Sequence, residues 1–283
     1  MAAAAAARLA AVGAFLDAAA PRSQLVLIGQ TRSALAELSA QRTMQRGASF
    51  GIHKKTLSGL AAEVAMIPLA ESGRTIGPRL ALDLLLGRVV LELLRDRQLG
   101  VLGASSEASR LAVALTPGFV PALSRTFFEL DLAMGEARTD PLTRLAELGP
   151  LSAEVAALYR RYREEVARQA LATRGDVLRL AAFHVGTSPF AGLDVALVDA
   201  RLTSTAERMF AAALFRQATR VLVVLPTGDD QTAHSLREMG IVVQREPEAN
   251  GDPMSAFRAR LFDSDSEVAP PPKRTSIRAG SQP

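Results

Sequence analysis

The segment that most constrains the fold is 25–36, where a short apolar run ends at a glycine and a helical pattern starts at once. In such a strand–turn–helix, the phosphate-binding pattern G-x-x-x-x-G-K-[ST] sets its lysine and its hydroxyl just inside the helix. Counted from Gly29, those two positions hold Leu35 and Ala36, so no cation for the phosphates and no hydroxyl for Mg²⁺ stands there. The segment indicates an α/β protein. It is either an ordinary strand–helix turn or a phosphate loop that has lost its chemistry.

Composition narrows the classes of function. The chain has 283 residues, enough for one large domain or two small ones. It has no cysteine, and its three histidines lie far apart, so we expect no disulfide framework and no metal site. A formal net charge of +4 permits nucleic acid as a partner without requiring it. We also expect no cofactor.

The N-terminus is rich in alanine but is not typical of a signal peptide. It lacks a basic region before its apolar run, and Asp17 interrupts that run. We therefore predict a surface helix there. No apolar run is long enough to cross a bilayer, so we expect no membrane partner and predict a cytoplasmic protein.

The order of apolar runs predicts the fold class. Short runs bounded by turn residues predict parallel strands at 25–28, 195–198 and 221–225, with a shorter one at 241–243. About 165 residues separate the first two strands, and they carry helical patterns at 57–70, 79–95, 106–114, 120–134 and 152–170. We predict an α/β core at 1–72 and 190–262, a large all-helical insertion at 73–189, and a tail or linker at 263–283 that is too polar to order itself.

Three features follow one another along the chain. The first is the altered loop at Gly29, and the second is an apolar strand that ends in Asp199. The third is the strand at 221–225, followed by Gly228-Asp229-Asp230-Gln231, which is similar to the Gly-Asp-x-x-Gln motif of superfamily 1 helicases with one spacer residue fewer. Together with residues 47–57, these features resemble the inactivated helicase-like region of AddB-type proteins, which carry the nuclease in bacterial helicase–nuclease complexes and are identified as members of the PD-(D/E)XK nuclease family. The resemblance runs from about residue 24 to residue 262.

The resemblance implies a P-loop NTPase-like (RecA-like) core that has lost catalysis. In an active motor of this kind a glutamate follows the strand-end aspartate and activates water, but Ala200 follows Asp199 here. We therefore predict no ATPase activity and no catalytic residue. The positions that would have touched a nucleotide are relics: Gly29, Thr31, Ser33, Asp199, Asp229 and Gln231.

The resemblance also implies a role and partners. The chain would be a non-catalytic lobe of a helicase–nuclease that acts in DNA double-strand break repair, with an AddA-like helicase subunit as its partner and single-stranded DNA as a possible ligand. Neither a second helicase-like lobe nor a nuclease centre is readable in the 283 residues. Two other functions stay open: a small α/β nucleotide-binding protein or enzyme that uses the Gly29 turn through backbone contacts, and a stand-alone interaction module or truncated gene product.

Two basic segments are candidates for DNA contact. Lys54, Lys55 and Thr56 lie in a neighbourhood that looks like the helicase motif touching single-stranded DNA; otherwise this is a basic turn in which Thr56 begins a helix. Arg160, Arg161 and Arg163 are interleaved with two tyrosines, which suits phosphate contact and base stacking. The alternative is a solvated helix with pairs from Arg160 to Glu164 and from Arg161 to Glu165.

The relic carboxylates also have structural interpretations. In the structural interpretation Asp199 helps to start the next helix, and Ser204-Thr205-Ala206-Glu207, a capping-box pattern, favours that interpretation. The polar residues 228–230 would then cap a helix that begins at Gln231.

Overall fold

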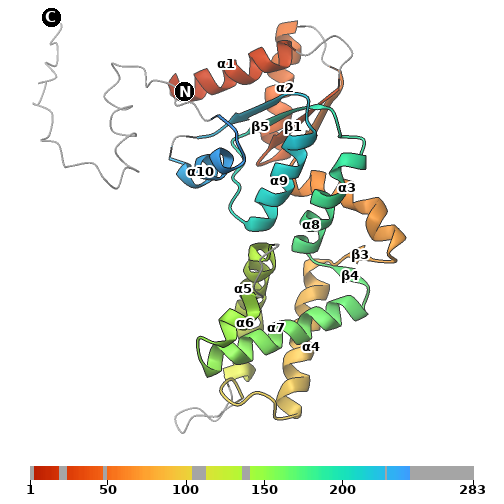
Figure 1. The fold of residues 1–283 in the computed structure, drawn as a ribbon, viewed down its shortest axis with the longest axis vertical. Coiled ribbons are helices and arrows are strands. Elements are labelled where there is room, and N and C mark those ends of the chain that lie inside the picture. Colours follow the sequence, from red (N-terminus) through yellow and green to blue (C-terminus); the bar gives the residue numbers. More distant parts are fainter. Residues whose placement is uncertain are drawn as a thin grey trace, which may run out of the picture.

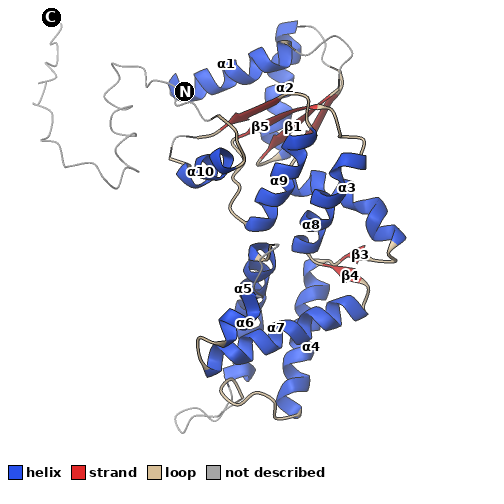
Figure 2. Ribbon diagram, in the orientation of Figure 1, coloured by secondary structure: helices blue, strands red, loops and turns tan. Residues whose placement is uncertain are grey.

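The structure is a computed structural model that describes residues 3–18, 24–46, 50–103, 113–135, 141–226 and 228–242. Figure 1 shows two bodies, an α/β body that holds the main sheet and a body made of helices alone. Figure 2 shows the same arrangement by secondary structure, with a short strand pair where the bodies join.

The main sheet has four parallel strands in the order β2-β1-β5-β6. Their bounds are β1 (Leu25–Gly29), β2 (Ile52–Lys55), β5 (Asp194–Val198) and β6 (Val221–Val224). The predicted α/β class with a parallel sheet is therefore confirmed, and so are the strands expected at 25–28, 195–198 and 221–225. The chain moves from β1 to one side and returns to the other, as in doubly wound sheets, so the strand order reverses between β1 and β5.

Two strand predictions differ from the structure. Residues 52–55 form β2, although the sequence suggested a basic turn, because this strand lies at the sheet edge and edge strands tolerate charged residues in place of an apolar run. The strand expected at 241–243 does not form at residues 241–242, and Val243 lies outside the described residues.

Helices cover both faces of the sheet because side chains alternate along each strand. Leu25 and Leu27 of β1 pack toward α1 (Ala3–Asp17) and α2 (Arg32–Arg46). Val26 and Ile28 pack on the opposite face, which is covered by α3 (Leu57–Glu71), α8 (Arg174–His184) and α9 (Thr205–Gln217). The short α10 (Asp230–Glu238) adds Leu236 to the second face. A strand buried on both faces needs a continuous apolar run, which is why β1 and β5 were readable from the sequence.

The helical body has a core of its own. It consists of α4 (Arg79–Arg95), α5 (Phe119–Ala133), α6 (Pro141–Ala146) and α7 (Pro150–Arg168), with a 3₁₀ turn at Val113–Leu115 before α5. Phe127 packs edge-on against Tyr159 with ring centroids 5.0 Å apart, and Leu86 and Leu158 complete the centre. The predicted helices at 79–95, 120–134 and 152–170 are confirmed within two residues at each end. Most of the one expected at 106–114 lies outside the described residues.

The boundary of the helical insertion differs from the predicted 73–189. The strands β3 (Thr75–Ile76) and β4 (Leu171–Ala172) pair with each other where the chain leaves and re-enters the α/β body. Beyond β4, Val177, Leu178 and Ala181 of α8 are buried in the core beneath the sheet. The insertion therefore closes at β4, and α8 belongs to the α/β body.

The tail or linker expected at 263–283 lies outside the described residues. In the ranges that the structure does cover, no helix is both long enough and apolar enough to cross a membrane.

Candidate functional site

The six relic positions follow the carboxyl ends of three neighbouring strands. Gly29, Thr31 and Ser33 come with β1, Asp199 follows β5, and the pair Asp229 and Gln231 follows β6. Because the strands are parallel, these ends meet at one edge of the sheet, and the strand order reverses between β1 and β5. Doubly wound folds usually bind their ligands beside such a reversal. The residues singled out in the sequence therefore lie at the edge of the sheet where folds of this kind bind ligands.

The loop after β1 is filled by a side chain. Leu35 is 2% exposed, and a Cβ built on Gly29 would lie 2.7 Å from Leu35 Cδ2. The Thr31 hydroxyl accepts the N–H of Ala34 at 3.2 Å, and Ser33 Oγ donates to Thr31 Oγ1 at 3.3 Å. Leu35 and the start of α2 therefore take up the space and one of the hydroxyls that a phosphate cradle would need.

Asp199 is paired with a cation from the chain's own first helix. Its carboxylate lies 3.3 Å from Nε of Arg8 on α1, and its N–H donates to Val224 C=O at 2.8 Å. Its φ of +49° is the left-handed conformation, which turns the chain sharply at the end of β5. The expectation that Asp199 starts the next helix was wrong: Ser204 caps α9, and the predicted capping box of Ser204 with Glu207 is confirmed.

The residues after β6 serve a helix start. Asp229 Oδ1 accepts the N–H of Thr232 at 3.2 Å, which caps α10 as predicted, although that helix begins one residue earlier than Gln231. Thr232 Oγ1 then accepts the N–H of Leu202 at 3.2 Å and ties α10 to the loop after β5. Gln231 is exposed on the first turn. In the described part of the chain, no group of three or more metal-ligating side chains is close enough to hold a metal ion.

The other candidate site is the edge strand β2. Lys54 Nζ lies 3.4 Å from Ser39 Oγ on α2, while Lys55 on the opposite face of the strand pairs with Glu63 of α3. Thr56 caps α3 by accepting the N–H of Gly59 at 3.1 Å, as predicted. Just before β2, the ring of Phe50 is 90% exposed. The edge therefore presents two lysines, one of them with a carboxylate partner, next to an aromatic ring in solvent.

Arg32 is a cation at this end of the sheet that sequence reasoning missed. It is exposed at the start of α2, and its guanidinium lies 3.9 Å from a Cβ built on Gly59 in the first turn of α3. Its position directly after the altered phosphate loop was the available signal.

The three arginines of α7 do not share one surface. Arg160 is exposed, and Arg161 pairs with Glu164 at 3.3 Å. The predicted pair from Arg161 to Glu165 does not form, because Glu165 is buried between α4 and α7 and bonds to Arg88 and Arg168. Arg163 points toward the carboxylates of Asp131 and Asp176.

Arg163 belongs to a network of charges that links the two bodies. Its guanidinium lies 2.6 Å from Asp176 of α8 and 3.3 Å from Asp131 of α5. Arg179 bonds to both carboxylates, and Arg74 bonds to Asp176 at 3.0 Å. Burial raises the pKa of Asp176, but the hydrogen bond and charge of Arg163 outweigh it and hold that pKa far below its usual range. Burial and the charge of Asp131 raise the pKa of Tyr162 to about 12, so this tyrosine stays neutral.

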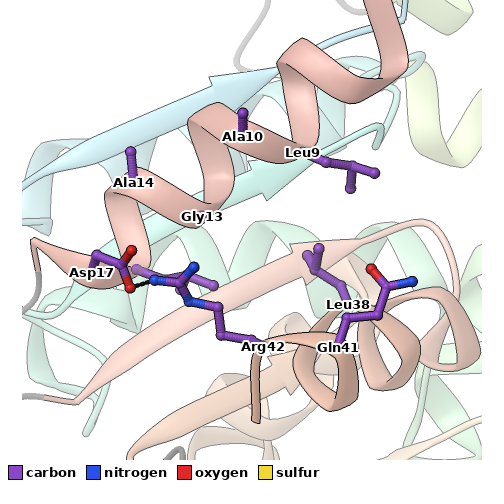
Figure 3. Close-up of a pocket in the computed structure, with 9 residues that line it drawn as sticks. Leu9, Ala10, Gly13, Ala14, Asp17, Leu38, Gln41 and Arg42 are labelled. Atoms are coloured by element: carbon purple, nitrogen blue, oxygen red, sulfur yellow. Dashed lines mark ion pairs between the residues drawn. The ribbon is translucent and has the colours of Figure 1, made fainter. Parts of the chain in front are cut away.

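A groove lies between α1 and α2. Its volume is about 390 Å³, and Figure 3 shows Leu9, Gly13 and Leu38 among its lining residues, with the ion pair of Asp17 and Arg42 across it. None of the predicted site residues lines it.

Comparison of the sequence with protein-family models and with curated proteins identifies no significantly similar protein or family.

Proposed function

We propose that this chain is a non-catalytic, helicase-like lobe of an AddB-like helicase–nuclease that acts in DNA double-strand break repair in the cytoplasm. In this proposal the α/β body is a P-loop (RecA-like) core that no longer uses nucleotide. Its roles are to scaffold a complex with an AddA-like helicase subunit and to contact single-stranded DNA along β2.

The filled loop supports the loss of ATP chemistry. Leu35 occupies the position of the lysine that stabilises charge on the transferred phosphoryl group, a contribution worth several kcal/mol. Asp199 is paired with Arg8, and Ala200 stands in place of the residue that would activate water. Three parts of one mechanism are thus missing or occupied, which also argues against a nucleotide-binding enzyme built on the Gly29 turn.

The observation that carries the DNA-binding part is the basic edge of β2 beside Phe50. Proteins that hold single-stranded DNA without sequence preference combine cations along the backbone with aromatic rings on which bases stack. Lys54 and Lys55 supply the cations, and Phe50, one residue before the turn into β2, supplies an exposed ring. The α7 arginines contribute less, because Arg161 and Arg163 already face carboxylates.

Scaffolding is supported by an exposed apolar stripe on α4. Leu80, Leu84 and Leu91 are 71%, 66% and 57% exposed, and their spacing puts them on one side of the helix. Contiguous apolar surface of this kind is typical of protein–protein interfaces. We assign the stripe to the helicase subunit.

The test of DNA binding is fluorescence anisotropy of a labelled single-stranded oligonucleotide across a salt series. We expect binding that weakens with salt, and we expect Lys54→Gln/Lys55→Gln to lower the steepness of the log–log salt dependence by about 1.4, since each phosphate contact to a single strand contributes about 0.7. Arg95→Gln/Arg97→Gln removes two exposed cations elsewhere and should leave the dependence unchanged. Binding that is undetectable at low salt refutes the DNA-binding part.

A second measurement reports stacking directly. The sequence contains no tryptophan, so Phe50→Trp creates a single fluorescent reporter at the proposed contact. Added oligonucleotide should quench it, whereas Phe183→Trp, at another exposed phenylalanine, should give no comparable change. Equal quenching at both positions would rule out a specific contact at Phe50.

A further inference from the structure

The outer edge of β2 has unpaired backbone groups. Among the described residues, β1 is the sole strand neighbour of β2. The N–H of Leu25 donates to Gly51 C=O at 2.9 Å, and Leu25 lies opposite Ile52 in the register. Because alternate residues of a parallel strand face the same neighbour, His53 and Lys55 direct their N–H groups to β1, and Ile52 and Lys54 direct theirs outward. An extended chain could pair with those outward groups as a fifth strand.

Charge decides what kind of chain fits this edge. The strand reads Ile-His-Lys-Lys, and the described side chains around its two lysines include one paired carboxylate, Glu63. A second copy of β2 would bring the same cations against themselves, and like charges on neighbouring strands are destabilising. The fitting occupant is an acidic extended segment.

The chain contains such a segment after its last described residue. Residues 263–267 read Asp-Ser-Asp-Ser-Glu, and in an extended strand the alternation puts all three carboxylates on one side. That side can face Lys54, whose neighbour Ser39 is uncharged, but not Lys55 on the other face of β2 as well. Asp263 is 21 residues beyond Val242. Fully extended, 21 residues span up to about 69 Å, whereas the four-strand sheet is only roughly 14 Å across its three strand spacings. The linker can therefore reach β2.

We propose that residues 263–267 add to the open edge of β2 as an acidic strand and compete with single-stranded DNA for Lys54. The competition rests on the proposed function, whereas the strand pairing does not. Asp and Ser are poor strand formers, so the pairing depends on the charges. The tether supplies a local concentration in the millimolar range, which allows a weak contact to be occupied.

Amide hydrogen exchange of the full chain tests the pairing residue by residue. In the wild type, Ile52 and Lys54 should exchange slowly, and so should His53 and Lys55, which pair with β1. In Asp263→Asn/Asp265→Asn/Glu267→Gln, the exchange of Ile52 and Lys54 should become at least about tenfold faster while His53 and Lys55 stay protected. The charge-conserving variant Asp263→Glu/Asp265→Glu/Glu267→Asp should behave as the wild type. Fast exchange of Ile52 and Lys54 in the wild type, or protection that survives neutralisation, overturns the proposal.

Oligonucleotide binding separates this inference from the function on which its second half rests. If both hold, the neutralised variant binds the labelled single strand severalfold more tightly than the wild type at low salt. If the amides of Ile52 and Lys54 are protected but no oligonucleotide binds, the strand pairing is supported and the proposed DNA-binding function is refuted. Binding that is equally tight in both proteins, with unprotected edge amides, keeps the function and refutes the pairing.

Discussion

Replacing Gly175 by alanine tests how the two bodies are joined. Gly175 lies in the first turn of α8, and its N–H donates to Asp131 Oδ2 at 2.8 Å. A Cβ at this position would lie 2.5 Å from that oxygen and 2.6 Å from the backbone oxygen of Asp131. The second contact is with backbone, so a rotamer change cannot relieve it. The end of α5 must then move away from α8.

The size of the effect follows from what that movement breaks. Asp131 is buried and accepts hydrogen bonds from Gly175, Arg163 and Arg179. Separating one partner from a buried charge network costs about 3–5 kcal/mol. Helix propensity acts in the opposite direction, because alanine in a helix is favoured over glycine by about 1 kcal/mol. Subtracting the helix-propensity gain from the cost of the broken network, we expect Gly175→Ala to lower the free energy of unfolding by about 2–4 kcal/mol.

Thermal unfolding followed by circular dichroism measures this loss. In a chain of this size each kcal/mol lowers Tm by about 2–4 °C, so a fall of roughly 4–16 °C is expected. Gly87→Ala is the matched control, because Gly87 lies inside α4 and the nearest atom to its added Cβ is 3.9 Å away, on Val120. That variant should keep or raise Tm. A Gly175→Ala protein as stable as Gly87→Ala would refute the close approach of α5 to α8.

Three further outcomes are expected. Ser204→Ala removes the cap of α9 and should cost about 1 kcal/mol in chemical denaturation, whereas Ser204→Asp should restore most of it; equal stability of all three proteins would contradict the capping box. Because the pKa of Asp176 is depressed in the fold, its stabilising contribution is complete above the unfolded-chain pKa of about 3.9 and declines as pH falls below it. Asp176→Asn should therefore be less stable than the wild type at pH 7, with a smaller gap at pH 3; a gap independent of pH would contradict this assignment. A ligand that binds only the folded state raises Tm, so ATP with Mg²⁺ should leave Tm unchanged if the loop after β1 binds no nucleotide. A rise in Tm that Asp199→Ala abolishes would contradict this interpretation of the loop.

The sequence predicts the fold correctly where the residues of a single segment determine its secondary structure. Helix α4 was predicted to the residue because Pro78 precedes an apolar-periodic run that ends at Arg95. The strand β2 was missed because its stability comes from pairing with β1 and its own residues are polar. Helix α8 is not among the helices predicted from the sequence, although its capping box of Thr173 and Asp176 is a local signal.

The candidate site was less predictable because its contacts join distant residues. Arg8 reaches Asp199 across most of the chain, so no spacing rule could have paired them. The inward turn of Arg163 depends on Asp131 and Asp176, which lie on two other helices. The relic positions follow the ends of parallel strands and therefore lie at one edge of the sheet, but the partners that occupy them follow from packing alone.

The distribution of charge shows why the density of basic residues in a sequence is a poor guide to a nucleic-acid surface. The stretch with the most arginines, on α7, folds against carboxylates from α4, α5 and α8. Arg163 is half-buried between two of these carboxylates, and Arg161 has acidic neighbours. In the shorter basic run on β2, Lys55 is paired with one carboxylate, that of Glu63. A phosphate must compete with a carboxylate at α7, whereas Lys54 Nζ donates to the neutral hydroxyl of Ser39 at 3.4 Å. Oligonucleotide affinity should therefore respond more to Lys54→Gln than to Arg161→Gln, and the reverse order would move the proposed interface to the helical body.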